Sequence, residues 1–361
     1  MDFLIFVIAL SILVLVHEFG HFLAAVKCGI RVEEFGLGLP PKIVGKKIGK
    51  TIFSLNWLPI GGFCKLYGED PPSPKASEGE LASKNKKESF YFKSPWQKLL
   101  VVVGGVLMNL VLAVAIFTVV YAVLGVPEET KMVKVVEVVK DSPAETAGLT
   151  EGDWVMEVGG VAVYKPEELT TEVAKYKGES VKLKVYKVNK VEEEIEVKVR
   201  ETPPDGEGAM GVAISNIEMR PMKWYEFYKG IWYGFKEGYF WGKIIVSGVF
   251  KMIGDLFMGK VPKDVAGPIG MFEATSSIRK SQGLLAVIHF FGVVSVNLAV
   301  VNMLPFPALD GGRIIFVVYE ILTKKKANQK FEAAVNNIGM IILLSLILLI
   351  AVGDVAKLIN K

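Results

Sequence analysis

The sequence predicts a polytopic α-helical membrane protein with four transmembrane helices and one inserted α+β domain. Its mean hydropathy is +0.40 and 51% of its 361 residues are hydrophobic, which is too apolar for an ordinary soluble protein. Four apolar segments approach the ~20 residues that a helix needs to cross the hydrocarbon, and the segment between the second and third alternates in polarity like strands. The net charge of +4 is small, and we expect no nucleic-acid partner.

Four spans and the charges between them set the expected topology. The first segment runs directly into titratable residues and lacks a basic start, so we interpret it as a retained span and not as a signal peptide. Lys and Arg outnumber Asp and Glu by 13 to 7 in residues 27–98, which predicts a cytoplasmic loop. Both termini and the inserted domain then lie outside. The predicted spans are residues 2–26, 99–124, 284–304 and 338–352.

The inserted domain is predicted over residues 126–203. A loose alternation at 131–139, a short helix ending at Gly148, a helix from Pro166 and a hairpin around Asn189 indicate a small α+β fold. The stretch SPAETAGLTEGDWVMEVGG resembles a PDZ domain of the circular arrangement found in bacterial proteases. That resemblance implies a groove that takes an extended peptide or a C-terminus. A rigid spacer with an empty groove is the alternative.

Two further segments lie outside the predicted spans and the inserted domain. Residues 222–258 are rich in Trp, Tyr and Lys, so we expect an amphipathic helix along the outer leaflet and disfavour a fifth span. Residues 70–89 are expected to form a solvated linker. The predicted boundaries are 1–26 (first span), 27–98 (cytoplasmic side), 99–125 (second span), 126–203 (PDZ-like), 204–283 (interfacial helix and connector), 284–305 (third span), 306–337 (cytoplasmic loop) and 338–361 (fourth span and C-terminus).

The first span contains the motif HEFGH. In a helix, His17 and His21 lie on one face and can hold one metal ion, and Glu18 beside them can accept a proton from water. Zinc is the default metal for two imidazoles, one further ligand and an open position. Ionisable groups inside a span are costly and indicate function by default. The alternative is a pair of helix-packing histidines, which would leave Glu18 in need of a partner.

A third ligand is required, and the sequence offers two candidates. Asp310 follows a break in the third span at NMLPFPALDG, where freed backbone groups are tolerable only inside protein or beside a wet cavity. The expected topology brings Asp310 to the same inner half as His21. It leaves His289 near the outer end of the third span, so we favour Asp310. The two cysteines, Cys28 and Cys64, form no CxxC pattern.

Together, HEFGH and NMLPFPALDG resemble the site-2 protease family of intramembrane zinc metalloproteases. SFYFKSPWQKLLVVVGGVLMNLVLAV and AGPIGM extend the resemblance over most of the chain. It implies one Zn²⁺ per chain held by His17, His21 and Asp310, with Glu18 as general base. It also implies that Asn302 positions substrate or stabilises an oxyanion.

The same resemblance implies a membrane-associated β-hairpin in LPIGGFCKLYGE, residues 58–69. An open strand edge there would pair with an unwound substrate helix; a simple turn is the alternative for the two glycines. The tentative substrate-binding residues are Gly61, Gly62, Phe63, Cys64 and Lys65. The implied setting is a bacterial inner membrane, where relatives cleave single-pass proteins such as membrane-bound anti-sigma factors in stress signalling.

The sequence departs from the resembled family in two places. It has room for one PDZ-like domain where some members carry two, which weakens any size-exclusion role inferred from tandem domains. It also reads GGVLMN where many members have a proline after the glycines. Two other function classes remain open: a membrane zincin of quality-control type and a non-catalytic membrane PDZ adaptor.

Overall fold

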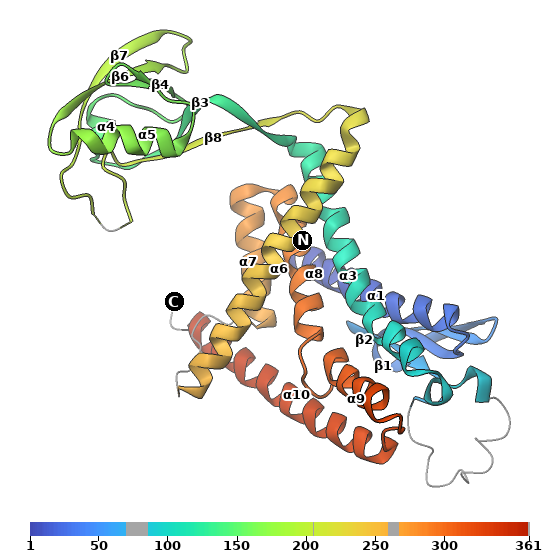
Figure 1. Ribbon diagram of the computed structural model, residues 1–361. Helices are drawn as coiled ribbons and strands as arrows, with labels where there is room; N and C mark the ends of the chain where they lie inside the picture. The colour runs from blue at the N-terminus through green and yellow to red at the C-terminus, as the bar shows by residue number, and fades with distance from the viewer. Residues whose placement is uncertain (70–85, 205, 259–266, 360–361) are drawn as a thin grey trace. The chain divides into compact units, whose positions relative to one another are not determined.

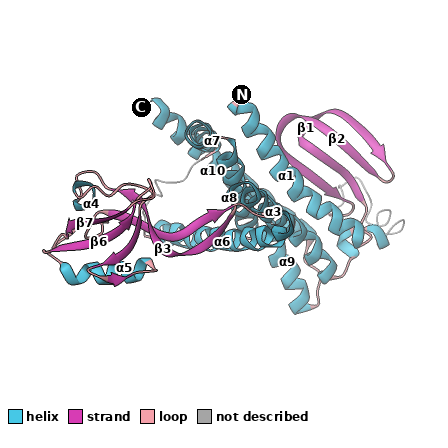
Figure 2. Ribbon diagram, turned by 90° about the horizontal axis from the view of Figure 1, so that it is seen from above, coloured by secondary structure: helices cyan, strands magenta, loops and turns pink. Residues whose placement is uncertain are grey.

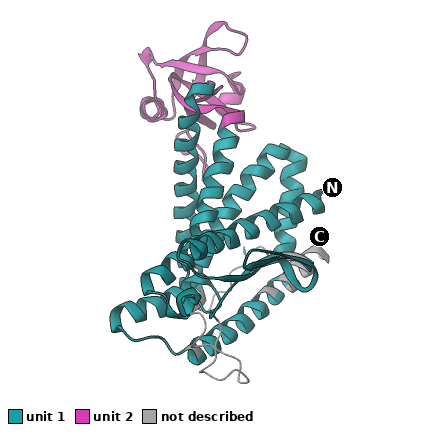
Figure 3. Ribbon diagram, turned by 90° about the vertical axis from the view of Figure 1, so that its right-hand side faces the viewer, with its two compact units in different colours: residues 1–121, 224–361 teal, residues 122–223 magenta. Residues whose placement is uncertain are grey.

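The computed structural model describes residues 1–69, 86–204, 206–258 and 267–359 (Figure 1). The predicted linker at 70–89 lies largely outside the described residues. The chain divides into two compact units (Figure 3), one formed by residues 1–121 and 224–361 and the other by residues 122–223.

Four helices among the described residues are long and apolar enough to cross a membrane, as predicted. They are α1 (Asp2–Lys27), α3 (Pro95–Leu124), α8 (Leu284–Asn302) and α10 (Gln329–Ile359). The candidate span within α10 is Lys330–Ile350, so the helix begins before the predicted start of the apolar span at 338. Two adjacent asparagines lower the hydropathy at 336–337 without ending the helix.

Helices α1 and α3 touch backbone to backbone. A Cβ atom on Gly20 would lie 2.2 Å from the carbonyl oxygen of Gly104, and one on Gly104 would lie 2.7 Å from that of Gly20. Glycine therefore permits an approach that any side chain would prevent, as is common between helices in membranes. This approach brings the middle of α3 against the HEFGH motif.

The start of α1 is fixed by α7 (Pro268–Gln282), a helix that the sequence analysis assigned to a connector. The carboxylate of Asp2 pairs with Arg279 at 2.6 Å and accepts a hydrogen bond from Ser276 at 2.8 Å. The buried side chains of Leu13 and Phe291 join α1 and α8 in one core. These contacts fix the position of the HEFGH motif of α1 along the length of α8.

Helix α6 (Phe227–Phe257) follows the turn η4 (Trp224–Glu226) and runs alongside α3 and α8 (Figure 1). Trp241 packs on buried Phe117, and a Cβ atom on Gly234 would lie 2.8 Å from the carbonyl oxygen of Val114. One face of α6 therefore packs on two of the candidate spans, a contact that the expectation of a helix along the outer leaflet did not include. Gly234 and Trp241 lie about two helical turns apart and therefore share the face of α6 that packs on the spans. Lys236 lies on another face and is exposed.

A hairpin lies beside α1 as β1 (Val32–Ile48) and β2 (Thr51–Leu66) (Figure 2). It is longer than predicted and turns at residues 49–50, so that the predicted segment 58–69 contributes only the later part of β2 and the residues after it. Both strands bend back, because residues 34–37 pair with 52–55 on one side and with 62–65 on the other. Residues 42–48 pair with 51–56. Within the described pairings, 62–66 is therefore an edge of this sheet.

The segment 306–337, expected as a loop, contains helix α9 (Asp310–Thr323) and the start of α10. Glu320 of α9 lies in a buried ion pair with Lys98 of α3, at 3.0 and 2.8 Å to its two oxygens, and also accepts the Ala327 N–H at 3.1 Å. A buried carboxylate needs such partners. At 14 residues, α9 is too short to cross the hydrocarbon, so a search of the sequence for spans does not find it.

The second unit is a six-stranded antiparallel sheet with two short helices, close to the predicted order of elements. Its strand order is β7-β6-β4-β3-β8, with β5 paired to β4. The elements are β3 (Val126–Val138), α4 (Pro143–Thr146), β4 (Trp154–Val158), β5 (Val161–Ala162), α5 (Pro166–Val173), η3 (Ala174–Tyr176), β6 (Ser180–Tyr186), β7 (Glu192–Lys198) and β8 (Val212–Arg220).

The predicted end of this domain at residue 203 is too early. Strand β8 pairs with both ends of β3, from Val126 with Arg220 to Val138 with Val212. The long β3 strand needs a partner along the edge that β4 does not cover. The unit therefore continues to residue 223.

Asp153 holds the turn before β4 in this unit. Its carboxylate is fully buried and accepts bonds from the Thr150 N–H at 2.8 Å, Lys187 Nζ at 3.0 Å and the Val188 N–H at 3.2 Å. Burial raises the pKa of the Asp153 carboxyl, but the hydrogen bonds from Thr150, Lys187 and Val188 outweigh burial and hold it below its ordinary value. The stability that this carboxylate contributes is thus present above the pKa of the unfolded chain and is lost as the pH falls through the folded one.

We predict that Asp153→Asn weakens the second unit by about 1–3 kcal/mol at neutral pH, because buried donors lose a charged acceptor. Hydrogen exchange of the β4 and β6 amides in the full-length chain measures the change. The difference between wild type and variant should shrink in acid, as Asp153 of the wild type becomes protonated.

Glu172→Gln is the matched control, since it breaks the surface pair of Glu172 on α5 with Lys175 on η3 and should change exchange by less than about 0.5 kcal/mol. Equal effects of the two substitutions would contradict the role assigned to Asp153.

Candidate metal centre

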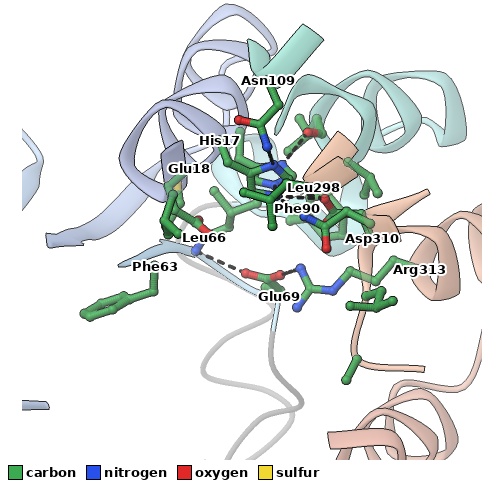
Figure 4. A pocket seen from close by; sticks show the side chains of 18 residues that line it. His17, Glu18, Phe63, Leu66, Glu69, Phe90, Asn109, Leu298, Asp310 and Arg313 are labelled. Atoms are coloured by element: carbon green, nitrogen blue, oxygen red, sulfur yellow. Dashed lines mark hydrogen bonds and ion pairs between the residues drawn. The ribbon is translucent and has the colours of Figure 1, made fainter. Parts of the chain in front are cut away.

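His17, His21 and Asp310 converge on one point inside the first unit (Figure 4). Both histidines come from one face of α1, and Asp310 is the first residue of α9. The distances are 3.2 Å between the two Nε2 atoms, 3.1 Å from His17 Nε2 to Asp310 Oδ2 and 3.4 Å from His21 Nε2 to the same oxygen. The sequence analysis predicted these three ligands, and the structure brings all three together.

These distances fit a zinc ion. Bonds of about 2.0–2.1 Å at tetrahedral angles place neighbouring ligand atoms roughly 3.3–3.4 Å apart, and the three distances range from 3.1 to 3.4 Å. Asp310 Oδ2 is buried and accepts no hydrogen bond among the described residues. Three atoms with lone pairs directed at one point require a cation, or a second proton on an imidazole, to be stable.

Helix α3 contacts the Nδ1 atom of each imidazole, on the side of the ring away from the metal position. His21 Nδ1 lies 2.8 Å from the Val101 carbonyl oxygen; because a carbonyl only accepts, Nδ1 carries the proton and Nε2 keeps its lone pair for a metal. The amide of Asn109 lies 3.3 Å from His17 Nδ1. Turning that amide so that Oδ1 accepts from Nδ1–H gives the same tautomer and satisfies an oxygen that otherwise has no partner.

Asn109 was missed by the sequence analysis, although an amide in the middle of an apolar span was a usable signal. It is fully buried. Gly105, one turn earlier, was also missed. A Cβ atom on Gly105 would lie 2.4 Å from His21 Nε2 and 2.8 Å from His17 Cε1, so only glycine leaves room for the two rings.

The two predicted catalytic residues, Glu18 and Asn302, line the same cavity of about 350 Å³. Asn302 ends α8, with Nδ2 3.4 Å from His17 Nε2. Its amide therefore reaches the metal position without being a ligand. The cavity is lined by Val14, His17, Glu18, His21, Phe63, Cys64, Leu66, Glu69, Phe90, Val101, Val102, Asn109, Leu298, Asn302, Ala308, Leu309, Asp310 and Arg313.

The strand edge passes next to Glu18. A Cβ atom on Gly62 would lie 3.4 Å from Glu18 Cγ, and Phe63 and Cys64 line the cavity. Gly61 and Lys65 are not among the lining residues, and Lys65 lies 3.6 Å from Glu33. Three of the five tentative substrate-binding residues thus lie at the site.

The rival ligand His289 lies elsewhere. Its Nε2 pairs with Glu237 of α6, and its ring centroid is 5.3 Å from that of Phe117. The metal-binding cluster among the described residues does not include it. His289 therefore joins α8 to α6 and lies apart from the metal-binding cluster.

We predict that Gly105→Ala lowers zinc binding, because the added methyl group displaces His21. Zinc content per purified chain, measured by atomic absorption, should fall well below that of wild type. Gly248→Ala is the matched control: a Cβ atom there meets nothing within 4 Å, and it should leave the zinc content unchanged. Equal zinc in both variants would contradict the packing assigned to Gly105.

Comparison with known proteins places the chain among metallopeptidases. The model of peptidase family M50 matches residues 5–346. A Clostridium perfringens protein with the provisional name zinc metalloprotease is 33% identical over 351 residues, covering 96% of each chain. The zinc metalloprotease RasP of Shouchella clausii is 28% identical, covering 98% of this chain and 99% of its own.

Among solved structures, the PDZ domain of an SdrC-like protein from Listeria monocytogenes covers 24% of this chain and 90% of its own, with 25% identity and a TM-score of 0.22. It is a partial likeness and carries no weight for function here. The match to the family model over nearly the whole length shows that the chain belongs to peptidase family M50, the site-2 protease family, and is a zinc metalloprotease of the membrane type.

Proposed function

We propose that the chain is an intramembrane endopeptidase that cuts transmembrane segments of single-pass proteins. The observation that carries this proposal is the position of the three-ligand cluster. Two ligands lie within α1, a candidate span, and the third begins α9, after a short break that follows α8, another candidate span. A cavity with an adjoining strand edge lies at the same point.

His17, His21 and Asp310 would hold zinc, which when bound acidifies water and polarises a carbonyl group. Glu18 would take the proton from the attacking water and pass it to the leaving amine. Asn302 would donate an N–H to the oxygen on which negative charge develops. Support comes from the shared cavity and from the amide of Asn302 beside His17.

The substrate must lose helical hydrogen bonds before its backbone can be cut. Unpaired N–H and C=O groups at membrane depth cost several kcal/mol each. The edge at 62–66 offers replacement bonds, and Gly62 lets an added strand lie close to Glu18. A substrate segment added there would pass the metal in an extended form.

The biological setting is proposed from the resemblance and from the charges of the loops. Substrates would be single-pass proteins of the anti-sigma-factor kind, and the second unit would bind an extended peptide or C-terminus in the manner of a PDZ domain. The protein would lie in a bacterial inner membrane, with both termini and the second unit outside. We propose the predicted segment boundaries with the changes at α6, α9 and β8 described above.

We predict that Glu18→Gln abolishes cleavage, by at least about 100-fold, because it removes the carboxylate next to His17 that would take the proton. Its zinc content should equal that of wild type, since Glu18 is not a ligand. Cleavage of a single-pass protein reconstituted with the purified enzyme measures the first, and metal analysis the second. Retained cleavage would exclude Glu18 as the general base.

We predict that Asp310→Ala lowers zinc affinity by more than the roughly 10- to 100-fold expected for loss of an outer partner. Competition with a chelator of known affinity measures this without any assay of activity. His289→Gln is the matched control and should keep full affinity. Normal affinity in Asp310→Ala together with loss in His289→Gln would reverse the assignment of the third ligand.

A further inference from the structure

Glu69 and Arg313 form an ion pair at the wall of the metal cavity, outside the set of groups that the proposed chemistry uses (Figure 4). Glu69 follows β2, and Arg313 lies one helical turn after Asp310 on α9. The side chain of Glu69 is 14% exposed and that of Arg313 is 42% exposed. The pair therefore joins the hairpin to the helix that carries a metal ligand.

The two oxygens of Glu69 bind different elements. Oε1 accepts from Arg313 Nη1, and Oε2 accepts the backbone N–H of Leu66 at 3.3 Å. Leu66 is the last residue of the strand edge and also lines the cavity. One carboxylate thus connects the end of this edge directly to α9.

The strand end is held rigidly on its own side. The Tyr67 N–H donates to the Arg31 carbonyl oxygen at 2.8 Å, and the Phe90 N–H donates to the Tyr67 carbonyl oxygen at 2.9 Å. The Glu69 N–H returns to the Leu66 carbonyl oxygen at 3.3 Å. The turn that presents Glu69 is therefore fixed to the strand and does not hang free.

The helix side is equally constrained. A Cβ atom on Gly311 would lie 2.0 Å from the Leu304 carbonyl oxygen, and one on Gly312 would lie 2.4 Å from that of Phe306. The first turn of α9 is therefore packed tightly against the chain that leads into it. Any shift of Arg313 relative to Asp310 would require this packing to change.

We propose that the Glu69–Arg313 pair positions the strand edge 62–66 against the metal centre and so determines which peptide bond of an added substrate strand is cut. A strand advances ~3.3 Å per residue, so an edge that slides by that distance presents the next peptide bond and turns its side chains to the other face. Both residues are positioning residues, since they act through the strand and the helix.

This inference rests on the proposed function, and the experiment separates the two. A synthetic single-span peptide in detergent micelles is incubated with the full-length zinc-loaded enzyme, and mass spectrometry identifies every bond cut. Wild type should cut one dominant bond. Arg313→Met and Glu69→Gln should spread the cuts over neighbouring bonds, with zinc content per chain equal to wild type.

Two further variants supply controls. Arg313→Lys keeps a positive charge opposite Glu69. This variant should cut the same dominant bond as wild type. Glu88→Gln breaks the pair of Lys50 with Glu88, which also ties the hairpin to a neighbouring segment but does not reach α9. It should leave the cut position unchanged.

Each outcome of this experiment has one meaning. The same single bond cut by every variant, even at a lower rate, would overturn the proposal and leave the proposed function intact. Loss of zinc in Arg313→Met and Glu69→Gln would also overturn it, because the pair would then support a ligand and not the strand. A wild-type enzyme that cuts no transmembrane peptide would refute the proposed function and, with it, this inference.

Discussion

The contact between Gly20 of α1 and Gly104 of α3 is the constraint on which the metal centre depends. It brings the α3 backbone within reach of the α1 rings, so that Val101 and Asn109 can orient two imidazoles that would otherwise face lipid. Larger side chains would separate the helices by several ångströms and leave buried polar atoms without partners. The same closeness requires a glycine at residue 105, where the rings fill the remaining space.

Asp310, the proposed third ligand, reaches this pair of helices in a different way. The chain breaks after α8, and α9 begins at Asp310, whose negative charge is favourable at a helix N-terminus. The buried pair of Lys98 and Glu320 ties the far part of α9 to α3. Helix α3 therefore contacts both halves of the metal centre, although it supplies no ligand. Its role is to make ligands from two distant segments meet with the correct tautomers and spacing.

Much of this arrangement was predictable because the rules behind it are local. The spacing of His17 and His21, and a broken span ending in Asp310, follow from helical periodicity and from the cost of polar groups in lipid. The Glu69–Arg313 pair was missed because its two residues lie far apart in the sequence. Asn109 is different, since an amide within an apolar span is itself a signal, but its partner His17 could not be named from the sequence. The packing of α6 on α3 and α8 was missed for a related reason: its composition describes an amphipathic surface but does not say whether lipid or other helices cover the apolar side.

The hairpin shows why this enzyme needs more than a metal centre. A cluster that activates water acts on any carbonyl that reaches it, so the bond that is cut depends on how the substrate backbone is held. Within the described pairings the sheet leaves 62–66 as an edge, and Gly62 brings that edge against Glu18. An open edge normally invites unwanted pairing. Under the proposed function, its position beside Glu18 suits an edge that a substrate strand would complete.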